Sequence, residues 1–140
     1  MKVQVIRSNR KTIGLEVRAD ESVILRAPAV DEILDVEWKS ILGEFTERVN
    51  HFCKVMDVTV GRITIRNQKT RWGSCSSKGN VNFNYQLYYM PRELMDYVII
   101  HELSHRRHMN HSAEFWQEVE KYCKTYRECR KKLRDYEIAP

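Results

Sequence analysis

The chain has 140 residues, of which 42% are hydrophobic and 31% charged, and its formal net charge is +5. This size and balance predict a single domain spanning residues 1–140 and are ordinary for a soluble globular protein. No apolar run is long enough to cross a membrane, and the first residues lack the apolar core of a signal peptide. The four cysteines form no C-x-x-C pair, so we expect free thiols in a reducing, cytoplasmic setting.

The first third of the chain predicts a small β unit followed by a helix. Alternating apolar and polar residues indicate strands over residues 2–6, 12–17 and 22–26. A hairpin turn at 18–21 joins the second and third of these strands. Apolar residues spaced three and four apart then predict one amphipathic helix over residues 31–56. Gly43 is a candidate break in this helix, because glycine is a poor helix former.

The middle of the chain predicts two further strands, at residues 62–66 and 80–87, with a polar loop at 68–75 between them. Residues 80–85 are a candidate exposed edge to which a peptide could add as an extra strand, and the equal alternative is an ordinary hairpin strand. The last predicted helix runs from 112 to 136, because its apolar residues recur at steps of four and three.

Between these segments, residues 91–105 have the pattern of a buried helix. Pro91 suits a first helical turn, and Glu93 in that turn complements the helix dipole. Apolar residues follow on both sides of the helix, which is typical of a helix that enters the core. Polar side chains at the end of such a helix are costly to bury, so they call for a function.

The end of this helix carries the motif His101-Glu102-Leu103-Ser104-His105. Residues four apart lie on the same face of a helix, so His101 and His105 can hold one metal ion while Glu102 borders the same space. Two histidines with a neighbouring carboxylate are the arrangement by which zinc hydrolases hold Zn²⁺ and activate a water molecule. A surface histidine cluster does not explain the apolar residues that lead up to this motif.

Two further histidines, His108 and His111, compete to be the third ligand. His108 lies on the same helical face as His101, but about 10 Å along the axis is too far for both to reach one ion. His111 can reach if the helix ends and Asn110 reverses the chain in the left-handed conformation. Ser112 then has the character of an N-cap for the next helix. We therefore predict His111 as the third ligand.

Other side chains are alternative candidates for metal ligands. A carboxylate from the following helix is the main alternative third ligand, the candidates being Glu114, Glu118 and Glu120. Cys75 is an alternative fourth ligand that would close the site, although a plain thiol is the simpler interpretation. The residue that completes an oxyanion site is not identified by a pattern, and the candidates are Tyr85, Tyr88, Tyr89 and His108.

Several segments together resemble the YgjP-like metallopeptidase domain, a family related to the SprT-like and WLM zinc peptidases. They are Arg7–Ile13, Arg26–Pro28, Arg71–Cys75, Pro91, Tyr97–His105, Asn110–Ser112 and Phe115–Trp116. The resemblance implies an α+β, zincin-like fold with a small twisted sheet, an active-site helix and a backing C-terminal helix. It also implies zinc held by His101, His105 and His111, with Glu102 as the catalytic residue.

The chain departs from this family in one segment. Family members are typically longer, with an extra β segment between the opening hairpin and the helix before the Arg-Trp-Gly-Ser-Cys motif. Residues 29–57 resemble a contracted version of that segment, with helical elements nearly joined around Gly43. The departure bears on the substrate surface and leaves the metal site unchanged.

The sequence therefore predicts a cytoplasmic zinc metallopeptidase that cleaves protein or peptide substrates, with Glu102 as general base. The alternatives are a zinc-stabilised binding module, which has no use for Glu102, and a protease that acts on DNA-bound proteins as in the SprT-like relatives. DNA contacts would come from the basic residues near the C-terminus, namely Arg127, Arg130, Lys131, Lys132 and Arg134. No DNA-binding motif supports nucleic acid as a partner.

Overall fold

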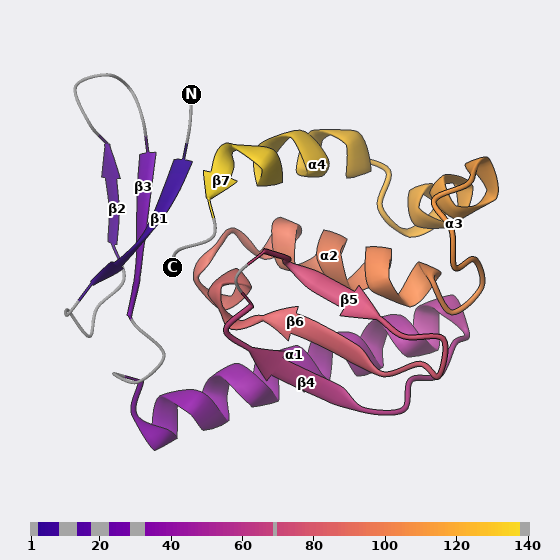
Figure 1. The fold of residues 1–140 in the computed structure, drawn as a ribbon, viewed down its shortest axis with the longest axis horizontal. Helices are drawn as coiled ribbons and strands as arrows, with labels where there is room; N and C mark the ends of the chain where they lie inside the picture. The colour runs from indigo at the N-terminus through magenta and orange to yellow at the C-terminus, as the bar shows by residue number, and fades with distance from the viewer. Residues whose placement is uncertain (1–2, 9–13, 18–22, 29–32, 69, 138–140) are drawn as a thin grey trace.

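The computed structural model describes residues 3–8, 14–17, 23–28, 33–68 and 70–137 (Figure 1). It is an α+β fold of two small sheets and a group of helices. The strands are β1 (Val3–Ser8), β2 (Gly14–Val17), β3 (Val23–Pro28), β4 (Ile63–Arg66), β5 (Gly73–Cys75), β6 (Val81–Asn84) and β7 (Tyr136–Glu137). The helices are α1 (Asp35–Met56), the short 3₁₀ helix η2 (Tyr85–Tyr89), α2 (Arg92–Ser104), α3 (Ala113–Tyr122) and α4 (Tyr126–Asp135).

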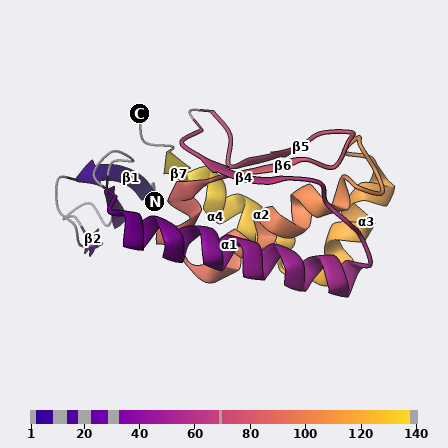
Figure 2. The same ribbon diagram turned by 90° about the horizontal axis from the view of Figure 1, so that it is seen from below.

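The central sheet has the strand order β4-β6-β5, with β4 parallel and β5 antiparallel to β6. Figure 2 shows this sheet as one layer, with α1 and α2 beneath it. Val81 and Phe83 of β6 are fully buried, and the Phe83 ring stacks on Phe45 of α1 with 5.9 Å between ring centroids. The core of the protein therefore lies between this sheet and the two helices.

The second sheet has the order β2-β3-β1-β7 and joins the two ends of the chain. β1 runs parallel to both β3 and β7, whereas β2 is antiparallel to β3. The three strands predicted near the N-terminus are confirmed, whereas the predicted turn at 18–21 lies outside the described residues. Because β7 follows α4 directly, this pairing ties the C-terminal helix to the N-terminal sheet.

The predicted amphipathic helix is confirmed as α1, but Gly43 does not break it. The helix continues from Asp35 to Met56, with a buried stripe made of Ile41, Phe45, Val49, Phe52 and Met56. Packing of this stripe against the core outweighs the small propensity cost of one glycine. Arg48 on the same helix donates to both carboxylate oxygens of Asp96 on α2, at 3.0 and 2.7 Å, which links the two helices.

Two predictions for the middle of the chain were wrong. The predicted polar loop at 68–75 contains β5, whose three residues pair with β6. The predicted strand 80–87 ends at Asn84, whose side chain accepts from the Gln86 backbone N–H and starts η2. β6 is also paired on both sides, so it cannot be the edge that accepts a peptide.

The single helix predicted over 112–136 is two helices, α3 and α4, separated at residues 123–125. Both contact α2, and the apolar stripe of Phe115, Tyr126, Cys129 and Leu133 is buried across the break. The apolar spacing over residues 112–136 therefore reflects core packing, as predicted. Tertiary contacts nevertheless bend the chain between α3 and α4. Within the described residues, the search for a helix with the length and apolar character to span a membrane finds none.

Gly43 offers a direct test of how α1 is stabilised. A Cβ atom added at Gly43 would meet no atom within 4 Å, and the residue lies inside the helix. We expect Gly43→Ala to raise the free energy of unfolding by about 0.5–1 kcal/mol, because alanine has the higher helix propensity. Urea denaturation followed by circular dichroism would measure this, and a loss of stability would contradict the continuous helix.

Candidate metal centre

Helix α2 carries the HExxH motif on a helix that is buried on most sides. Its buried residues are Leu94, Met95, Tyr97, Val98, Ile99, Ile100, Glu102, Leu103 and Ser104. His101 lies in the last turn, and His105 is the C-cap residue. The Ser104 hydroxyl donates to the Ile100 carbonyl at 2.7 Å, so this buried polar group is satisfied within the helix. The apolar pattern that predicted burial of residues 91–105 is thus confirmed.

The turn after α2 brings the chain back towards the helix by a different route from the predicted one. The helix ends at Ser104, and the N–H groups of Arg106, Arg107 and His108 donate to carbonyls of residues 103–104. Among the described residues, Asp57 is the one non-glycine residue with positive φ, so Asn110 is not left-handed. The predicted reversal occurs, but the predicted conformation of Asn110 was wrong.

Two arginines hold this turn in place. Arg106 donates to the carbonyls of Thr59 and Ser77, at 2.9 and 3.2 Å. Arg107 donates to the carbonyls of Met56 and Asp57, at 3.0 and 2.9 Å. Both anchors are backbone oxygens far away in the sequence, so the position of the turn depends on the tertiary fold.

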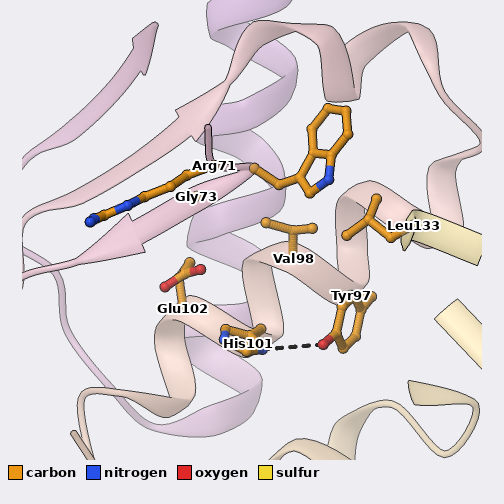
Figure 3. A pocket seen from close by; sticks show the side chains of 8 residues that line it. Arg71, Gly73, Tyr97, Val98, His101, Glu102 and Leu133 are labelled. Atoms are coloured by element: carbon orange, nitrogen blue, oxygen red, sulfur yellow. Dashed lines mark hydrogen bonds between the residues drawn. The ribbon is translucent and has the colours of Figure 1, made fainter. Parts of the chain in front are cut away.

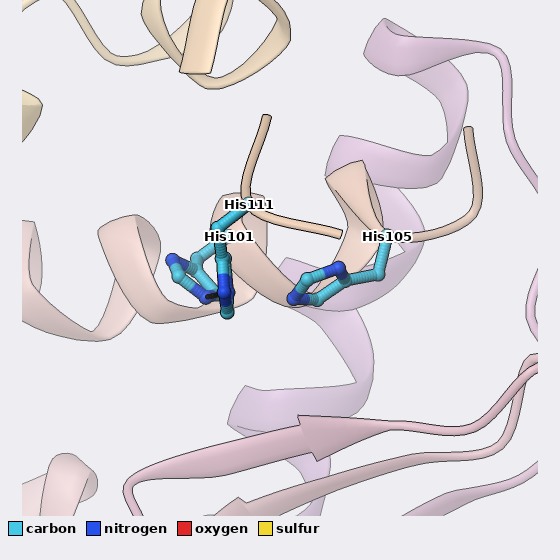
Figure 4. A group of neighbouring side chains, drawn as sticks. All are labelled: His101, His105 and His111. Atoms are coloured by element: carbon cyan, nitrogen blue, oxygen red, sulfur yellow. Dashed lines mark hydrogen bonds between the residues drawn. The ribbon is translucent and has the colours of Figure 1, made fainter. Parts of the chain in front are cut away.

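The turn places His111 beside His101 and His105, which come from the end of α2 (Figure 4). One ligand atom from each of the three residues lies within 4.8 Å of the others. The Nε2 atoms of His111 and His101 are 3.3 Å apart. Two nitrogens that share a tetrahedral zinc ion with bonds of about 2.1 Å are about 3.4 Å apart, so the separation suits a shared metal.

The other ring nitrogens have partners that orient the imidazoles. His105 Nδ1 lies 3.0 Å from the His108 carbonyl oxygen, which can only accept, so Nδ1 carries the proton and Nε2 keeps its lone pair. His101 Nδ1 lies 3.2 Å from the Tyr97 hydroxyl, which can accept its proton in the same way. Partners of this kind are what metal-ligating histidines commonly have on the ring nitrogen that does not bind the metal.

Phe115 forms the apolar floor of the site. Its fully buried ring lies 5.0, 4.5 and 5.0 Å, centroid to centroid, from His101, His105 and His111. Trp116 stacks on His111 at 5.9 Å. The preceding Ser112 is the N-cap of α3, as predicted, and its hydroxyl accepts from the Phe115 N–H. The start of α3 thus supports the face of the imidazoles opposite to solvent.

Burial determines the charge state of these histidines. It lowers the pKa of His101 to about 3, helped by the neighbouring imidazoles of His105 and His111 and by Arg130. Burial also lowers the pKa of His105, although its hydrogen bond to the His108 carbonyl opposes this. Both rings are therefore neutral at physiological pH, which is the form that binds a metal.

Glu102 lies beside the three histidines with its side chain 9% exposed. One of its carboxylate oxygens is 4.0 Å from His105 Nε2. Burial raises the pKa of Glu102 to about 8, and the positive charge of Arg71 opposes the rise. A carboxyl group with a strongly perturbed pKa next to a candidate metal site is typical of a functional residue.

These side chains open onto a pocket of about 320 Å³. The pocket is lined by the three histidines and Glu102, together with Arg71, Gly73, Ser74, Cys75 and Met109. β5 and Arg71, which lies two residues before it, therefore form the wall opposite the histidines. The arrangement leaves room for a substrate at the histidines, which is the condition for a catalytic rather than a closed structural metal site.

The side chains predicted as alternative metal ligands do not join the three histidines. Among the described residues the converging ligand set consists of the three histidines alone, without His108 or a carboxylate. Glu118 instead lies 3.5 Å from both Arg107 and Lys121. The Cys75 thiol lines the pocket but donates to the Ser76 carbonyl, so it is no fourth ligand in this arrangement.

Neither the tyrosines predicted as candidates for an oxyanion site nor His108 is among the residues that line the metal pocket. The Tyr89 hydroxyl donates to Glu37, and the buried Tyr85 ring packs against Trp38. Sequence reasoning missed Tyr97, Phe115 and Arg71 as parts of the site. A signal was available for Tyr97, which lies four residues before His101 and so on the same face of α2.

Comparison with known proteins identifies related metallopeptidases. Among solved structures, two zymogens resemble the chain: the metallopeptidase abylysin of Pyrococcus abyssi and the metallopeptidase jannalysin of Methanocaldococcus jannaschii. The TM-scores are 0.58 and 0.57, and each is 25% identical over 64% of this chain and 90% or 92% of its own. No curated protein matches.

The fold is thus that of the zincin-like metallopeptidases, and the chain is a peptidase of that class. A family model for the YgjP-like metallopeptidase domain matches residues 4–136, and the chain belongs to this family. The resemblance predicted from the sequence motifs is confirmed, as is the predicted fold class.

Tyr97 tests the role of the hydrogen bond to His101. We expect Tyr97→Phe to weaken metal binding about tenfold, because the ring of His101 loses the partner that fixes its orientation. Isothermal titration of the metal-free protein with zinc measures the affinity. Tyr122→Phe, which changes a half-buried tyrosine on α3, is the control, and equal affinities for all three proteins would contradict the role.

The raised pKa of Glu102 predicts a pH dependence of stability in the metal-free protein. The folded protein keeps the proton up to about pH 8, whereas the unfolded chain releases it near pH 4.5, so stability falls as pH rises between these values. Between pH 5 and pH 9 the loss attributable to Glu102 is on the order of 4 kcal/mol. Glu102→Gln should remove this part of the decline. Denaturation of both proteins at several pH values in the presence of a chelator measures it, and parallel curves would contradict the shift.

Proposed function

We propose that this protein is a zinc-dependent metallopeptidase that hydrolyses peptide bonds with Glu102 as general base. The observation that carries the proposal is the convergence of three imidazoles beside a buried carboxylate at an accessible pocket. Three histidine ligands with an open fourth position are a donor set that suits catalytic zinc. Zinc would be held by His101, His105 and His111.

The chemistry divides between the metal and the protein. Bound zinc supplies a Lewis acid that activates a water molecule and polarises the substrate carbonyl. Glu102 accepts the proton of the attacking water and delivers it to the leaving nitrogen. A cation at the histidines would lower the pKa of Glu102 from its metal-free value, which makes the carboxylate available as a base at neutral pH.

Arg71 is the cationic side chain in the pocket wall, and it acts on Glu102 through its charge. Its position supports a role in stabilising the negative oxygen that develops as the carbonyl is attacked. Arg71 thus takes the oxyanion role for which the tyrosines and His108 were candidates, because none of those residues lines the pocket.

β5 provides the edge for a peptide substrate. Within the described part of the sheet, β5 pairs with β6 on one side, and Gly73, Ser74 and Cys75 line the metal pocket. An extended peptide that adds to the open side of β5 brings its backbone across the histidines. The substrate is therefore a protein or peptide segment in extended conformation.

The arrangement of the basic residues near the C-terminus favours this function over action on DNA-bound proteins. Arg130 lies over the Trp116 ring at 4.2 Å and Arg127 over the Tyr126 ring at 5.5 Å. Lys132 pairs with Glu93 at 2.8 Å. These three cations have partners within the protein. We therefore favour a protein substrate over nucleic acid as the partner. The four free thiols support a reducing compartment, and we place the protein in the cytoplasm.

Zinc content and peptidase activity test the proposal together. Protein purified without added metal should contain about one zinc per chain in the wild type and in Glu102→Gln. His111→Ala should lose most of the zinc, because two histidines leave the ion with half of a tetrahedral ligand set. Cleavage of an unstructured protein such as casein should fall by at least about 100-fold in both variants.

His51→Ala is the matched control, because this histidine lies exposed on α1 away from the site. It should retain both zinc and activity. Undiminished zinc in His111→Ala would contradict the ligand set, and full activity in Glu102→Gln would contradict the general base.

A further inference from the structure

A polar pocket of about 390 Å³ adjoins the metal pocket at strand β5. Its lining consists of two arginines, three side-chain amides and two hydroxyl groups, and contains no acidic residue. We propose that this polar pocket is a subsite for an acidic side chain of the peptide substrate, within about two residues of the scissile bond. The proposal rests on the peptidase function proposed above and adds to it a charge preference in the substrate.

The register of the central sheet places the polar pocket on the face that points away from the helices. Phe83 of β6 packs on α1, so its neighbour Asn82 points to the opposite, outer face. The Asn82 amide donates to the Ser74 hydroxyl of β5 at 3.3 Å, so Ser74 lies on the outer face as well. On β4, Ile65 packs against the core, and the next residue, Arg66, therefore also points outwards.

The two pockets meet at the edge strand β5. A Cβ atom at Gly73 would lie 3.1 Å from the Glu102 Cγ atom, so Gly73 faces α2 and the metal centre. Ser74, the next residue, lines both pockets together with Arg71. An extended peptide alongside β5 also turns successive side chains to opposite faces, with a rise of about 3.3 Å per residue. A residue next to one that faces the histidines therefore presents its side chain to the polar pocket.

The charge of the lining selects an anion. Neither Arg66 nor Arg71 forms an ion pair with an acidic residue of the described segments. A guanidinium group can donate two parallel hydrogen bonds to one carboxylate, which makes an acidic side chain its natural partner. In Figure 3 the Arg71 side chain points away from Tyr97 and Leu133, which keeps its charge near the metal centre and the polar pocket.

The loop that carries two of the lining residues is held in place before a ligand binds. The fully buried Asn84 side chain donates to the carbonyls of Gln68 and Arg71, at 2.9 and 3.2 Å. The side-chain oxygen of Gln68 is itself buried and pairs with no group of the described residues. Rotation of this amide presents its NH₂ group instead, so Gln68 can donate to a carboxylate in the pocket.

Binding of short peptide hydroxamates to the zinc-loaded protein tests the subsite without relying on turnover. The hydroxamate group chelates the metal and stands at one or the other end of a three-alanine peptide, in which each alanine is replaced in turn by glutamate or glutamine. Glutamine has nearly the size of glutamate without its charge. At one position we expect the glutamate compound to bind at least about tenfold more tightly than the glutamine compound, as measured by isothermal titration.

Two arginine variants place this preference in the polar pocket. Arg66 lines the polar pocket and not the metal pocket. Arg66→Gln should therefore reduce the advantage of glutamate to less than about threefold and leave binding of the all-alanine compound unchanged. Arg62→Gln is the matched control, because Arg62 is an exposed arginine just before β4 that does not line the pocket. It removes the same charge and should keep the full preference.

The outcomes separate the subsite from the function on which it rests. Equal binding of the glutamate and glutamine compounds at every position would overturn the acidic subsite while the metal centre stands. A preference that survives Arg66→Gln, or that falls equally in Arg62→Gln, would also overturn it. If a single-stranded oligonucleotide binds through Arg66 and glutamate has no advantage, the pocket serves nucleic acid and the proposal fails. Failure of the all-alanine compounds to bind the zinc-loaded protein would overturn the open metal site, and the subsite with it.

Discussion

The burial of polar groups at the end of α2 is the constraint on which the rest of the structure depends. Two imidazoles and a carboxylate are carried into the core by a helix that is apolar on most sides. Burial keeps the histidines neutral and raises the pKa of Glu102. A cation bound at the histidine lone pairs would offset the free energy of burying these groups and would stabilise the carboxylate.

The third histidine depends on contacts that are distant in the sequence. Arg106 and Arg107 fasten the turn after α2 to carbonyls at residues 56, 57, 59 and 77. Phe115 supports all three imidazoles from below. The ligand set is thus held by the end of α1 and the residues that follow it, by the loop after β5 and by the start of α3. The metal centre is therefore a product of the whole fold.

β5 has only three residues, yet it forms part of both the central sheet and the metal pocket. It is an edge strand of the central sheet, and its residues Gly73, Ser74 and Cys75 line the metal pocket. A polar segment that was predicted to be a loop therefore forms a wall of the metal pocket. Strand pairing of so short a segment depends on the partner β6, and the polar residues of 68–75 carry no alternating pattern that would have revealed it.

The amino-acid sequence by itself determined the residues that can bind a metal and the helix that carries two of them, because the i, i+4 spacing and the apolar approach are local properties. It also predicted the N-cap at Ser112 and the choice of His111 over His108. Only the tertiary structure decided the path of the turn, where arginines and not a left-handed Asn110 reverse the chain. It alone decided the break between α3 and α4, the central position of β6 and the cavity beside Glu102. These features arise from packing between segments far apart in the chain, which no local pattern encodes.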